Sequence, residues 1–355
     1  MGTIMQNNNR LEGTISWRSP SNIALIKYWG KFDGQIPANP SLSMTLKNAY
    51  TETVLQYQPA NTNSPEILVD GNQSEKFTTR IQNYFEKLQK HFPEIGSFSF
   101  RIKTHNTFPH SAGIASSASG FSALALCLLT WHENIRGNNY DDFFRMASDL
   151  ARQGSGSASR SVYGGMTVWG NHPDVAGSSD YFAIPVPVKV HPLFADLKDT
   201  ILIVDSGEKQ VSSSMGHASM TGHPFAEARY RQANANLSSI LKAITTGNWQ
   251  VFQDITENEA LTLHSLMMSA QNGYTLLKPD TLNILQEIKK IREQRQLNVC
   301  FTLDAGPNVH LIYPASESDA IKPWIEKTLP GYCENHHRIE DETGNGPVLL
   351  KNEKR

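Results

Sequence analysis

The sequence predicts an α+β fold, and three observations lead to this prediction. Apolar and polar residues alternate over Ser41–Gln58 and again over Ser97–Thr104, as they do in half-buried strands. Apolar residues recur at helical spacing over Glu75–Phe92, with Lys and Glu between them. Strand and helix patterns interleave in both halves of the chain, but the GxGxxG turn of a doubly wound fold is absent from the sequence.

Further elements follow the same two patterns. After Ser97–Thr104, a Gly/Ser loop leads into an apolar helix that runs to about Trp131, and Tyr140–Arg152 has the pattern of an amphipathic helix. Met166–Gly170 is strand-like. In the second half, the predicted helices are Pro224–Thr246, Asn248–Gln271 and Asp280–Gln294, and the predicted strands are Thr200–Asp205, Asn298–Asp304 and its partner Val309–Tyr313.

Length and composition indicate the class of protein. A chain of 355 residues, 39% hydrophobic and 19% charged, is typical of a globular protein with a sizeable core and about two domains. The Pro-rich stretch Pro185–Pro192 is the predicted boundary, which divides the chain into residues 1–190 and 191–355.

Charge and cysteine content exclude several kinds of partner. The net charge of −2 argues against the broad basic surface of a nucleic-acid-binding protein. Three widely spaced cysteines without a CxxC pair argue against a disulfide framework and favour a reducing compartment. Met1–Trp17 has no apolar core of a secretory signal, and no stretch approaches the roughly 18 apolar residues of a membrane span. The sequence therefore predicts a soluble, cytoplasmic protein that binds neither membrane nor nucleic acid.

The loop Pro109–Gly120 has the composition of an anion-binding site. Its small residues allow backbone N–H groups to approach a phosphate, and a helix that begins here would add the positive end of its dipole. The hydroxyls of Ser116, Ser117 and Ser119 are candidate ligands for phosphate oxygens or bound Mg²⁺. The alternative is a tight strand-to-helix connection in which small residues only permit packing. The position between a strand and an apolar helix favours the anion site.

Two further segments combine cations with hydrogen-bond donors. Lys27 and Lys31 flank Tyr28 and Trp29 in an otherwise apolar stretch, where a lysine can bind phosphate or tune a carboxylate. The alternative is a strand end with two solvated lysines. Gln153–Arg160 adds Gly and Ser donors and an arginine suited to a carboxylate, the alternative being a flexible linker.

Asp304 ends an apolar strand and enters a Gly-Pro turn within Thr302–Asn308. This position suits a catalytic base or a metal-associated group, but an aspartate that only stabilises the turn is common before Gly-Pro, and from this motif alone the turn role is the favoured interpretation. Metal-site spacing is not found among the histidines: His336 and His337 are adjacent, and His264 has no second histidine four residues away.

Five motifs, in order, resemble those of diphosphomevalonate decarboxylases, members of the GHMP small-molecule kinase superfamily. The resemblance spans about residues 14–313. The motifs are Asn22–Lys31, Ser41–Leu46 with Tyr50–Thr53, Phe108–Phe121, Ala151–Arg160 and Asp304–Asn308.

The resemblance implies a two-lobed GHMP kinase fold with mixed and antiparallel sheets flanked by helices and an active site in the cleft between the lobes. Residues 1–190 would form the ATP-binding lobe and residues 191–355 the lobe that carries Asp304. The family uses ATP and Mg²⁺ to phosphorylate the tertiary 3-hydroxyl of (R)-5-diphosphomevalonate, and loss of phosphate and CO₂ gives isopentenyl diphosphate. The family also implies a homodimer.

Roles carry over by position. Asp304 would orient or deprotonate the 3-hydroxyl, with Lys27 beside it, and Arg160 would hold the carboxylate that leaves as CO₂. The implied substrate-binding residues are Asn22, Tyr28, Lys31, Arg80, Ser155, Gly156, Ser157 and Ser214. The implied ATP-binding residues are Asn106, Pro109, Gly113, Ala115, Ser116, Ser117, Ser119 and Gly120, with Mg²⁺ held mainly by ATP phosphates and by Ser117.

Three positions depart from the family pattern. Pro40 stands where many relatives carry Ser, Ser214 stands where relatives carry Thr or Arg, and the helix with His264 lacks an Asn three residues before it. Two alternatives remain at this point. One is a GHMP kinase that phosphorylates mevalonate or phosphomevalonate without decarboxylation, and the other is a non-catalytic RNA-binding module.

Overall fold

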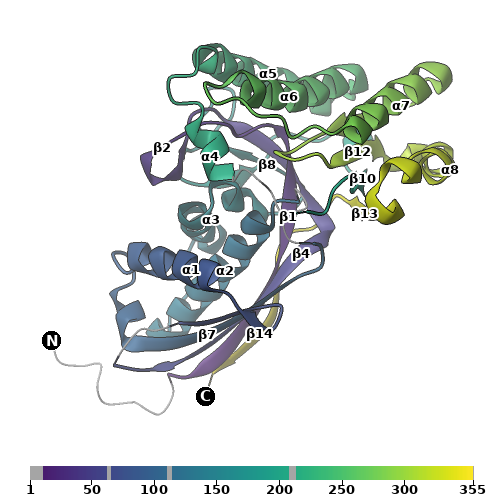
Figure 1. Cartoon of the computed structure of the whole chain (residues 1–355). Helices are drawn as coiled ribbons and strands as arrows, with labels where there is room; N and C mark the ends of the chain where they lie inside the picture. Colours follow the sequence, from purple (N-terminus) through teal and green to yellow (C-terminus); the bar gives the residue numbers. More distant parts are fainter. Residues whose placement is uncertain (1–10, 62–64, 110–113, 208–212, 355) are drawn as a thin grey trace.

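The structure is a computed structural model that describes residues 11–61, 65–109, 114–207 and 213–354. Its architecture is α+β, with two sheets and helices packed against each (Figure 1). Within the described residues, eight strands form the larger sheet in the order β14-β1-β4-β7-β5-β6, with β8 paired to β4 and β9 paired to β8. These strands are β1 (Gly13–Ile26), β4 (Ser41–Pro59), β5 (Glu66–Val69), β6 (Asn72–Gln73), β7 (Phe98–Asn106), β8 (Met166–Trp169), β9 (Ala183–Pro185) and β14 (Val348–Lys354).

The smaller sheet comes from the second half of the chain. Its four described strands pair antiparallel in the order β11-β12-β10-β13, and the sequence-predicted pairing of β11 with β12 is confirmed. These strands are β10 (Leu197–Leu202), β11 (Cys300–Thr302), β12 (Val309–Pro314) and β13 (Arg338–Glu342), and a separate hairpin joins β2 (Lys31–Phe32) to β3 (Ile36–Pro37).

Helices pack against one face of the larger sheet and against both faces of the smaller sheet. Figure 1 shows α1 to α3 beside the larger sheet, and α5 to α8 beside the smaller one. The bounds are α1 (Glu75–Leu88), α2 (Ser116–Arg136), α3 (Phe143–Gly154), α4 (Ser213–Ala218), α5 (Ala226–Thr246), α6 (Trp249–Ser269), α7 (Pro279–Arg295) and α8 (Ser318–Thr328). Among the described residues, no helix is both long and apolar enough to cross a membrane.

The core explains why the helical patterns form helices. In α1, the residues at helical spacing (Ile81, Tyr84, Phe85 and Leu88) are buried against the larger sheet. The predicted helix over Glu75–Phe92 is shorter in the structure. It ends at Leu88. The residue before a proline is disfavoured in the helical region, and Phe92, which precedes Pro93, has φ −129° and ψ 78°, so the helix could not extend through Phe92.

Two long strands connect the two sheets. The second half of β1 and the first half of β4 lie outside the first core and pack, through Ile23, Leu25, Leu42 and Met44, with residues of β10 and α6 in a continuous apolar cluster. Where the sheets meet, the Asp341 carboxylate of β13 accepts backbone hydrogen bonds from residues 47, 48 and 49 of β4 at 2.7–2.9 Å. Because β1 ends at this junction, the residue that follows β1 lies where the two sheets meet.

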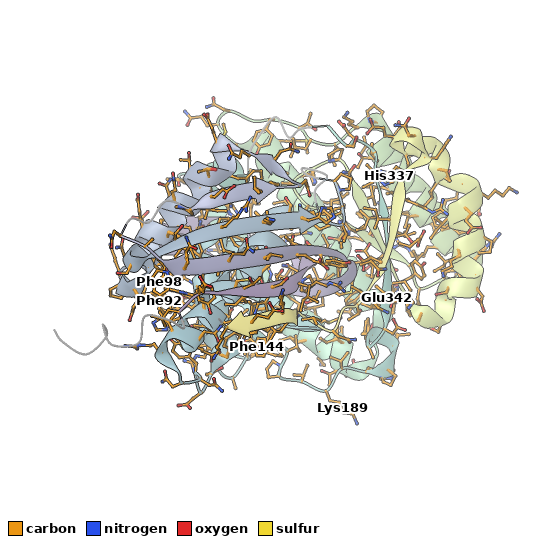
Figure 2. The ribbon with its side chains drawn as sticks, turned by 90° about the horizontal axis from the view of Figure 1, so that it is seen from below. Phe92, Phe98, Phe144, Lys189, His337 and Glu342 are labelled. Carbon is orange, nitrogen blue, oxygen red and sulfur yellow. The ribbon has the colours of Figure 1, made fainter. Side chains whose placement is uncertain are left out.

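The last strand, β14, returns to the larger sheet and pairs antiparallel with the start of β1, so the C-terminal segment lies beside N-terminal strands. In Figure 2 the labelled Phe92 and Phe98 lie at one end of the molecule and His337 and Glu342 in the other half, with the larger sheet in view between them. All three cysteines are free and buried.

Candidate active site

The junction of the two sheets brings a buried lysine and an aspartate together. Lys27 directly follows β1, and Asp304 follows β11 in a turn closed by a 2.7 Å hydrogen bond from the backbone N of Gly306 to the backbone O of Asp304. Nζ of Lys27 lies 3.0 Å from Oδ1 of Asp304. The Lys27 side chain is 2% exposed and the Asp304 side chain 24% exposed, so a ligand can reach the carboxylate but not the ammonium's stem. The two residues therefore form a largely buried ion pair where the two sheets meet, and Lys27 is not a solvated lysine at a strand end.

Burial and the neighbouring negative charge shift the pKa of Lys27 in opposite directions. Burial lowers the pKa of Lys27, while the Asp304 carboxylate beside it raises it. Behind Asp304, His264 of α6 lies with Nε2 3.1 Å from the Asp304 backbone oxygen. Burial lowers the pKa of His264 to about 4, so this imidazole is neutral at neutral pH, and Nε2 donates to that carbonyl.

Arg160 supplies a second buried cation close to this pair. It lies in a 3-10 helix over Gly156–Val162, so the segment is ordered and buried, not a flexible linker. Its Nη1 donates to Oγ of Ser41 at 2.6 Å and its Nε to Oδ1 of Asn22 at 3.3 Å. Burial lowers the pKa of Arg160 to about 10, and the Asp304 charge opposes this. Both of these hydrogen-bond acceptors are neutral, so its positive charge is not cancelled by them.

Asn22 of β1 joins the Arg160 segment to the sheet. Besides accepting from Arg160, it donates through Nδ2 to Oγ of Ser161 at 2.8 Å and to the backbone O of Ser157 at 3.2 Å. Gly156, at the start of the 3-10 helix, packs where a Cβ would lie 2.8 Å from the Trp169 ring and 2.9 Å from the Tyr28 ring. A side chain at this position would therefore displace an aromatic ring.

The start of α2 meets the same segment through serine hydroxyls. Ala115 adopts a left-handed conformation (φ 45°, ψ 44°) and α2 begins at Ser116. Oγ of Ser117 lies 3.2 Å from Oγ of Ser155, which in turn lies 3.4 Å from Oγ of Ser157. The structure thus brings the helix N-terminus of the predicted phosphate loop against the predicted substrate segment. A helix N-terminus offers free N–H groups and partial positive charge.

Other predicted ATP-binding residues have different surroundings. Ser119 is fully buried, and its Oγ lies 2.6 Å from Oγ1 of Thr51, which donates to Oδ1 of Asn106 at 2.7 Å. Pro109 is half-buried and lies in the loop that follows β7. Gly120 lies in the second turn of α2. Gly113 lies outside the described residues.

Two basic side chains and a tyrosine lie on another side of the junction. Nζ of Lys31 donates to Oε1 of Gln35 at 2.8 Å, and Arg80 of α1 lies over the Phe121 ring at 4.6 Å. Burial, followed by repulsion from Arg80, lowers the pKa of Lys31. The Tyr28 hydroxyl is buried without a hydrogen-bond partner among the described residues. Ser214 lies in α4, but its side chain is outside what the structure describes.

Sequence reasoning missed His217 of α4. Its Nδ1 accepts a hydrogen bond from the backbone N of Gly30 at 3.1 Å, and its ring lies 4.2 Å from the Tyr28 ring and 4.9 Å from the Trp29 ring. Burial, with the charges of Lys31 and Arg160, lowers the pKa of His217 to about 3. A single histidine on a short helix carries no local pattern, and only the fold shows its contacts.

The arrangement suits a molecule with more than one anionic group. The buried cations of Lys27 and Arg160 lie near the partly exposed Asp304 carboxylate, and the N-terminus of α2 contacts the Ser155–Ser157 segment. Among the described residues, no group of three or more His, Cys, Asp or Glu side chains is placed to hold a metal ion. A divalent cation would thus depend on ligand oxygens and hydroxyls such as that of Ser117, which suits phosphate-bound Mg²⁺.

Two domain families cover most of the chain. Residues 19–182 match the diphosphomevalonate decarboxylase-like N-terminal domain, and residues 200–354 match the mevalonate 5-diphosphate decarboxylase C-terminal domain. Diphosphomevalonate decarboxylase of Ganoderma lucidum is 30% identical over 335 residues, which are 88% of this chain and 81% of that protein. The Gibberella zeae enzyme is 28% identical over 333 residues, 89% of this chain and 85% of that protein.

Solved structures give the same result for the fold. A complex of MDDEF with MVAPP, AMPPCP and magnesium superposes with a TM-score of 0.82 at 28% identity, covering 96% of this chain and 100% of that chain. Mevalonate diphosphate decarboxylase from Staphylococcus aureus gives a TM-score of 0.82 at 26% identity, covering 96% and 98%. The predicted α+β GHMP kinase fold is thereby confirmed. With both domain families matched in order and a relative at 30% identity over most of its length, the chain belongs to the diphosphomevalonate decarboxylase family.

Proposed function

We propose that this protein catalyses the ATP-dependent decarboxylation of (R)-5-diphosphomevalonate to isopentenyl diphosphate, with release of ADP, phosphate and CO₂. The observation that carries the proposal is the Lys27–Asp304 pair at the floor of a junction that also holds the buried Arg160. The related structure that holds both MVAPP and AMPPCP with magnesium supports ATP, Mg²⁺ and diphosphomevalonate as the ligands.

Asp304 is the group that faces the reacting hydroxyl. A tertiary alcohol is a poor nucleophile, so a carboxylate that orients it and accepts its proton lowers the barrier to phosphoryl transfer. The partly exposed Asp304 carboxylate meets this need, and the ammonium of Lys27 at 3.0 Å holds it in one position. In this role Lys27 acts as a proton-bearing donor, so the active form of the pair has Lys27 protonated.

Arg160 binds the carboxylate that leaves as CO₂. Its two hydrogen-bond acceptors, Ser41 and Asn22, are neutral and fix the guanidinium without cancelling its charge. A buried guanidinium forms strong hydrogen bonds to a carboxylate and fixes its plane. Phosphorylation of the 3-hydroxyl makes it a good leaving group, and its departure builds positive character at C3, which draws the electrons of the C–CO₂ bond.

The phosphates are divided between two sets of residues. The N-terminus of α2, with the backbone of Ala115 and Ser116 and the hydroxyl of Ser117, faces the ATP phosphates. Mg²⁺ bound to those phosphates would neutralise part of their charge in the transition state. Tyr28, Lys31 and Arg80, with Asn22, Ser155, Gly156, Ser157 and Ser214, form the proposed site of the diphosphomevalonate tail. The remaining proposed ATP-binding residues are Asn106, Pro109, Gly113, Ser119 and Gly120.

A substrate panel tests the proposal. Purified protein is given ATP and Mg²⁺ with mevalonate, its 5-phosphate or its 5-diphosphate, and ADP and CO₂ are measured together. We expect ADP, phosphate and CO₂ in equal amounts with the 5-diphosphate. ADP without CO₂, from any of the three compounds, would instead establish a kinase of the same superfamily.

Assembly and location are further parts of the proposal. We infer a homodimer in the cytoplasm, as expected from the family resemblance. The three free, buried cysteines support a reducing compartment. Light scattering of the purified protein tests the assembly, and a monomer at micromolar concentration would contradict it.

A further inference from the structure

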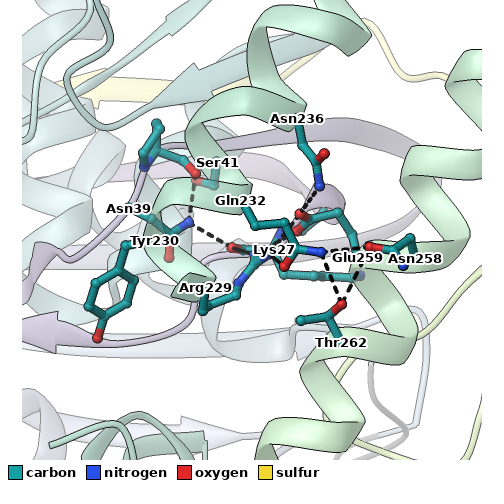
Figure 3. A network of polar contacts seen from close by, with 12 residues as sticks. Lys27, Asn39, Ser41, Arg229, Tyr230, Gln232, Asn236, Asn258, Glu259 and Thr262 are labelled. Atoms are coloured by element: carbon teal, nitrogen blue, oxygen red, sulfur yellow. Dashed lines mark hydrogen bonds and ion pairs between the residues drawn. The ribbon is translucent and has the colours of Figure 1, made fainter. Parts of the chain in front are cut away.

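We propose that the buried ion pair between Arg229 of α5 and Glu259 of α6 is a positioning device that grips the main chain of Lys27 and thereby holds its ammonium against Asp304. This inference rests on the proposed function and adds two residues that contact neither substrate nor ATP. Figure 3 shows the pair and the polar side chains around it.

The pair binds both backbone polar groups of Lys27, the N–H and the C=O. The backbone N of Lys27 donates to Oε2 of Glu259 at 2.8 Å, and the backbone O of Lys27 accepts from Nη2 of Arg229 at 2.9 Å. The backbone O also accepts from Nδ2 of Asn39 at 2.9 Å. Strand β1 ends at Ile26. At the next residue, Lys27, side chains from helices therefore form the backbone hydrogen bonds that a neighbouring strand would otherwise form.

The pair itself is rigid and dry. The two guanidinium nitrogens of Arg229 lie 2.7 Å and 2.6 Å from the two carboxylate oxygens of Glu259, and the side chains are 1% and 0% exposed. Asn236 donates to Oε1 of Glu259 at 2.7 Å, so the carboxylate has a fourth donor. Burying an ion pair is costly, and apolar residues of similar volume often serve stability as well or better. A precise role in placing Lys27 explains why charges occupy this position.

The pair also acts on the charge of Lys27. Four ionisable groups interact electrostatically with its ammonium: Asp304, Glu259, Arg160 and His264. A fifth, Arg229, contacts the backbone oxygen of Lys27. Burial lowers the pKa of Lys27, and Glu259, together with Asp304, opposes this. Removing the Glu259 charge therefore lowers the pKa of Lys27 further, so Lys27 loses its proton at a lower pH. A purely structural residue would not have this effect.

A second ion pair on α6 provides a matched control. Glu257, two residues before Glu259, accepts from Nη1 of Arg292 at 2.6 Å and joins α6 to α7. The Glu257 side chain is 10% exposed and that of Arg292 20% exposed, so loss of the Glu257 charge also leaves a partly buried arginine without its anion. Glu257→Gln and Glu259→Gln thus make the same chemical change on the same helix, but only Glu259 contacts Lys27.

The full chain with each substitution is assayed for CO₂ release from diphosphomevalonate across pH, and its thermal unfolding is measured. For Glu259→Gln we expect kcat to fall at least about 10-fold with KM for both substrates within about 3-fold. We also expect the basic limb of the kcat profile to move to lower pH. Glu257→Gln is expected to lose thermal stability while kcat and the basic limb stay those of the unmodified protein.

Glu259→Asp separates geometry from charge. The shorter side chain cannot reach both Arg229 and the Lys27 peptide, so kcat falls, but the retained charge keeps the basic limb at the pH of the unmodified protein. If Glu259→Gln does not fold, Glu259→Asp compared with Glu257→Asp decides the question through kcat alone. Equal kcat losses at Glu259 and Glu257 for equal losses of stability would overturn the inference. Failure of the unmodified protein to release CO₂ would overturn the proposed function instead.

Discussion

Nζ of Lys27 lies 3.0 Å from Oδ1 of Asp304, although 277 positions separate the two residues in the chain. Lys27 directly follows a strand of the larger sheet and Asp304 follows a strand of the smaller sheet, so the contact exists only when both sheets pack together. The Asp304 carboxylate thus lies at the interface of two halves of the chain, and its position depends on both.

Asp304→Asn is expected to lower CO₂ release at least about 100-fold, because the amide cannot accept the hydroxyl proton. MgATP binding, measured by calorimetry, is expected to stay within a few-fold of that of the unmodified protein. Asp205→Asn is the control, because Asp205 also lies in a turn at the rim of the smaller sheet, where it accepts from the backbone N of Gly207 at 2.8 Å and pairs with Lys278. An active Asp304→Asn protein would remove the proposed role of the carboxylate.

Arg160→Lys tests the substrate carboxylate site. Lysine keeps the positive charge but lacks the planar pair of donors that reaches Ser41 and a ligand at once. We expect kcat/KM for diphosphomevalonate to fall about 10- to 100-fold, the loss of one charged hydrogen bond, with KM for ATP unchanged. Arg292→Lys, which changes a partly buried arginine on α7 that pairs with Glu257, is expected to alter stability only. A rise in KM for ATP as large as the fall in kcat/KM for diphosphomevalonate would show that Arg160 does not act on the carboxylate.

Ser117→Ala tests the phosphate end of the site. Removal of its hydroxyl deletes the contact with Ser155 and one candidate ligand of phosphate-bound Mg²⁺. We expect KM for ATP to rise about 3- to 10-fold, as for one hydrogen bond, while KM for diphosphomevalonate changes less. Ser122→Ala is the control on the same helix, because Oγ of Ser122 accepts from Ser19 at 2.6 Å in the core and faces no ligand. Unchanged ATP kinetics in Ser117→Ala would place the ATP phosphates elsewhere.

Periodicity was sufficient to predict most elements, because each buries one face. The helical spacing in α1 and α5 and the alternation in β4 and β7 each give a buried stripe, and the structure has these elements where the pattern occurs. Strand β14 could not be predicted in this way, because it lies at a sheet edge and its side chains are all exposed. An edge strand exposed on both faces has no alternation.

The site residues also fall into those that the sequence can indicate and those that only the fold reveals. Lys27, Arg160 and Asp304 lie in motifs with unusual local composition, so the sequence alone indicated them. Glu259 and Arg229 lie on long helices among other polar residues, and nothing in their spacing distinguishes them from solvated charges. Only packing shows that both are buried at the end of β1, because long-range contacts and burial are properties of the fold.

Two buried histidines make the protein's stability depend on pH. The pKa of His217 is lowered to about 3 and that of His264 to about 4, against an ordinary value of about 6.5 in the unfolded chain. Between those values the unfolded state binds more protons, so the stabilising effect is complete above about pH 6.5 and is lost as pH falls toward 4 and then 3. Each histidine contributes at most about 1.4 kcal/mol per pH unit.

His217→Gln is therefore expected to make the free energy of unfolding depend less steeply on pH below about 6.5. Glutamine removes the titrating group and keeps an acceptor for the backbone N of Gly30. Urea unfolding between about pH 4.5 and 8 measures the slope, with the exposed His91→Gln as the control. A slope in His217→Gln equal to that of the unmodified protein would mean that His217 becomes protonated without unfolding the junction between α4 and the Tyr28–Lys31 segment. In that case the imidazole would not be the fixed acceptor that its contacts with Gly30 and the two aromatic rings indicate.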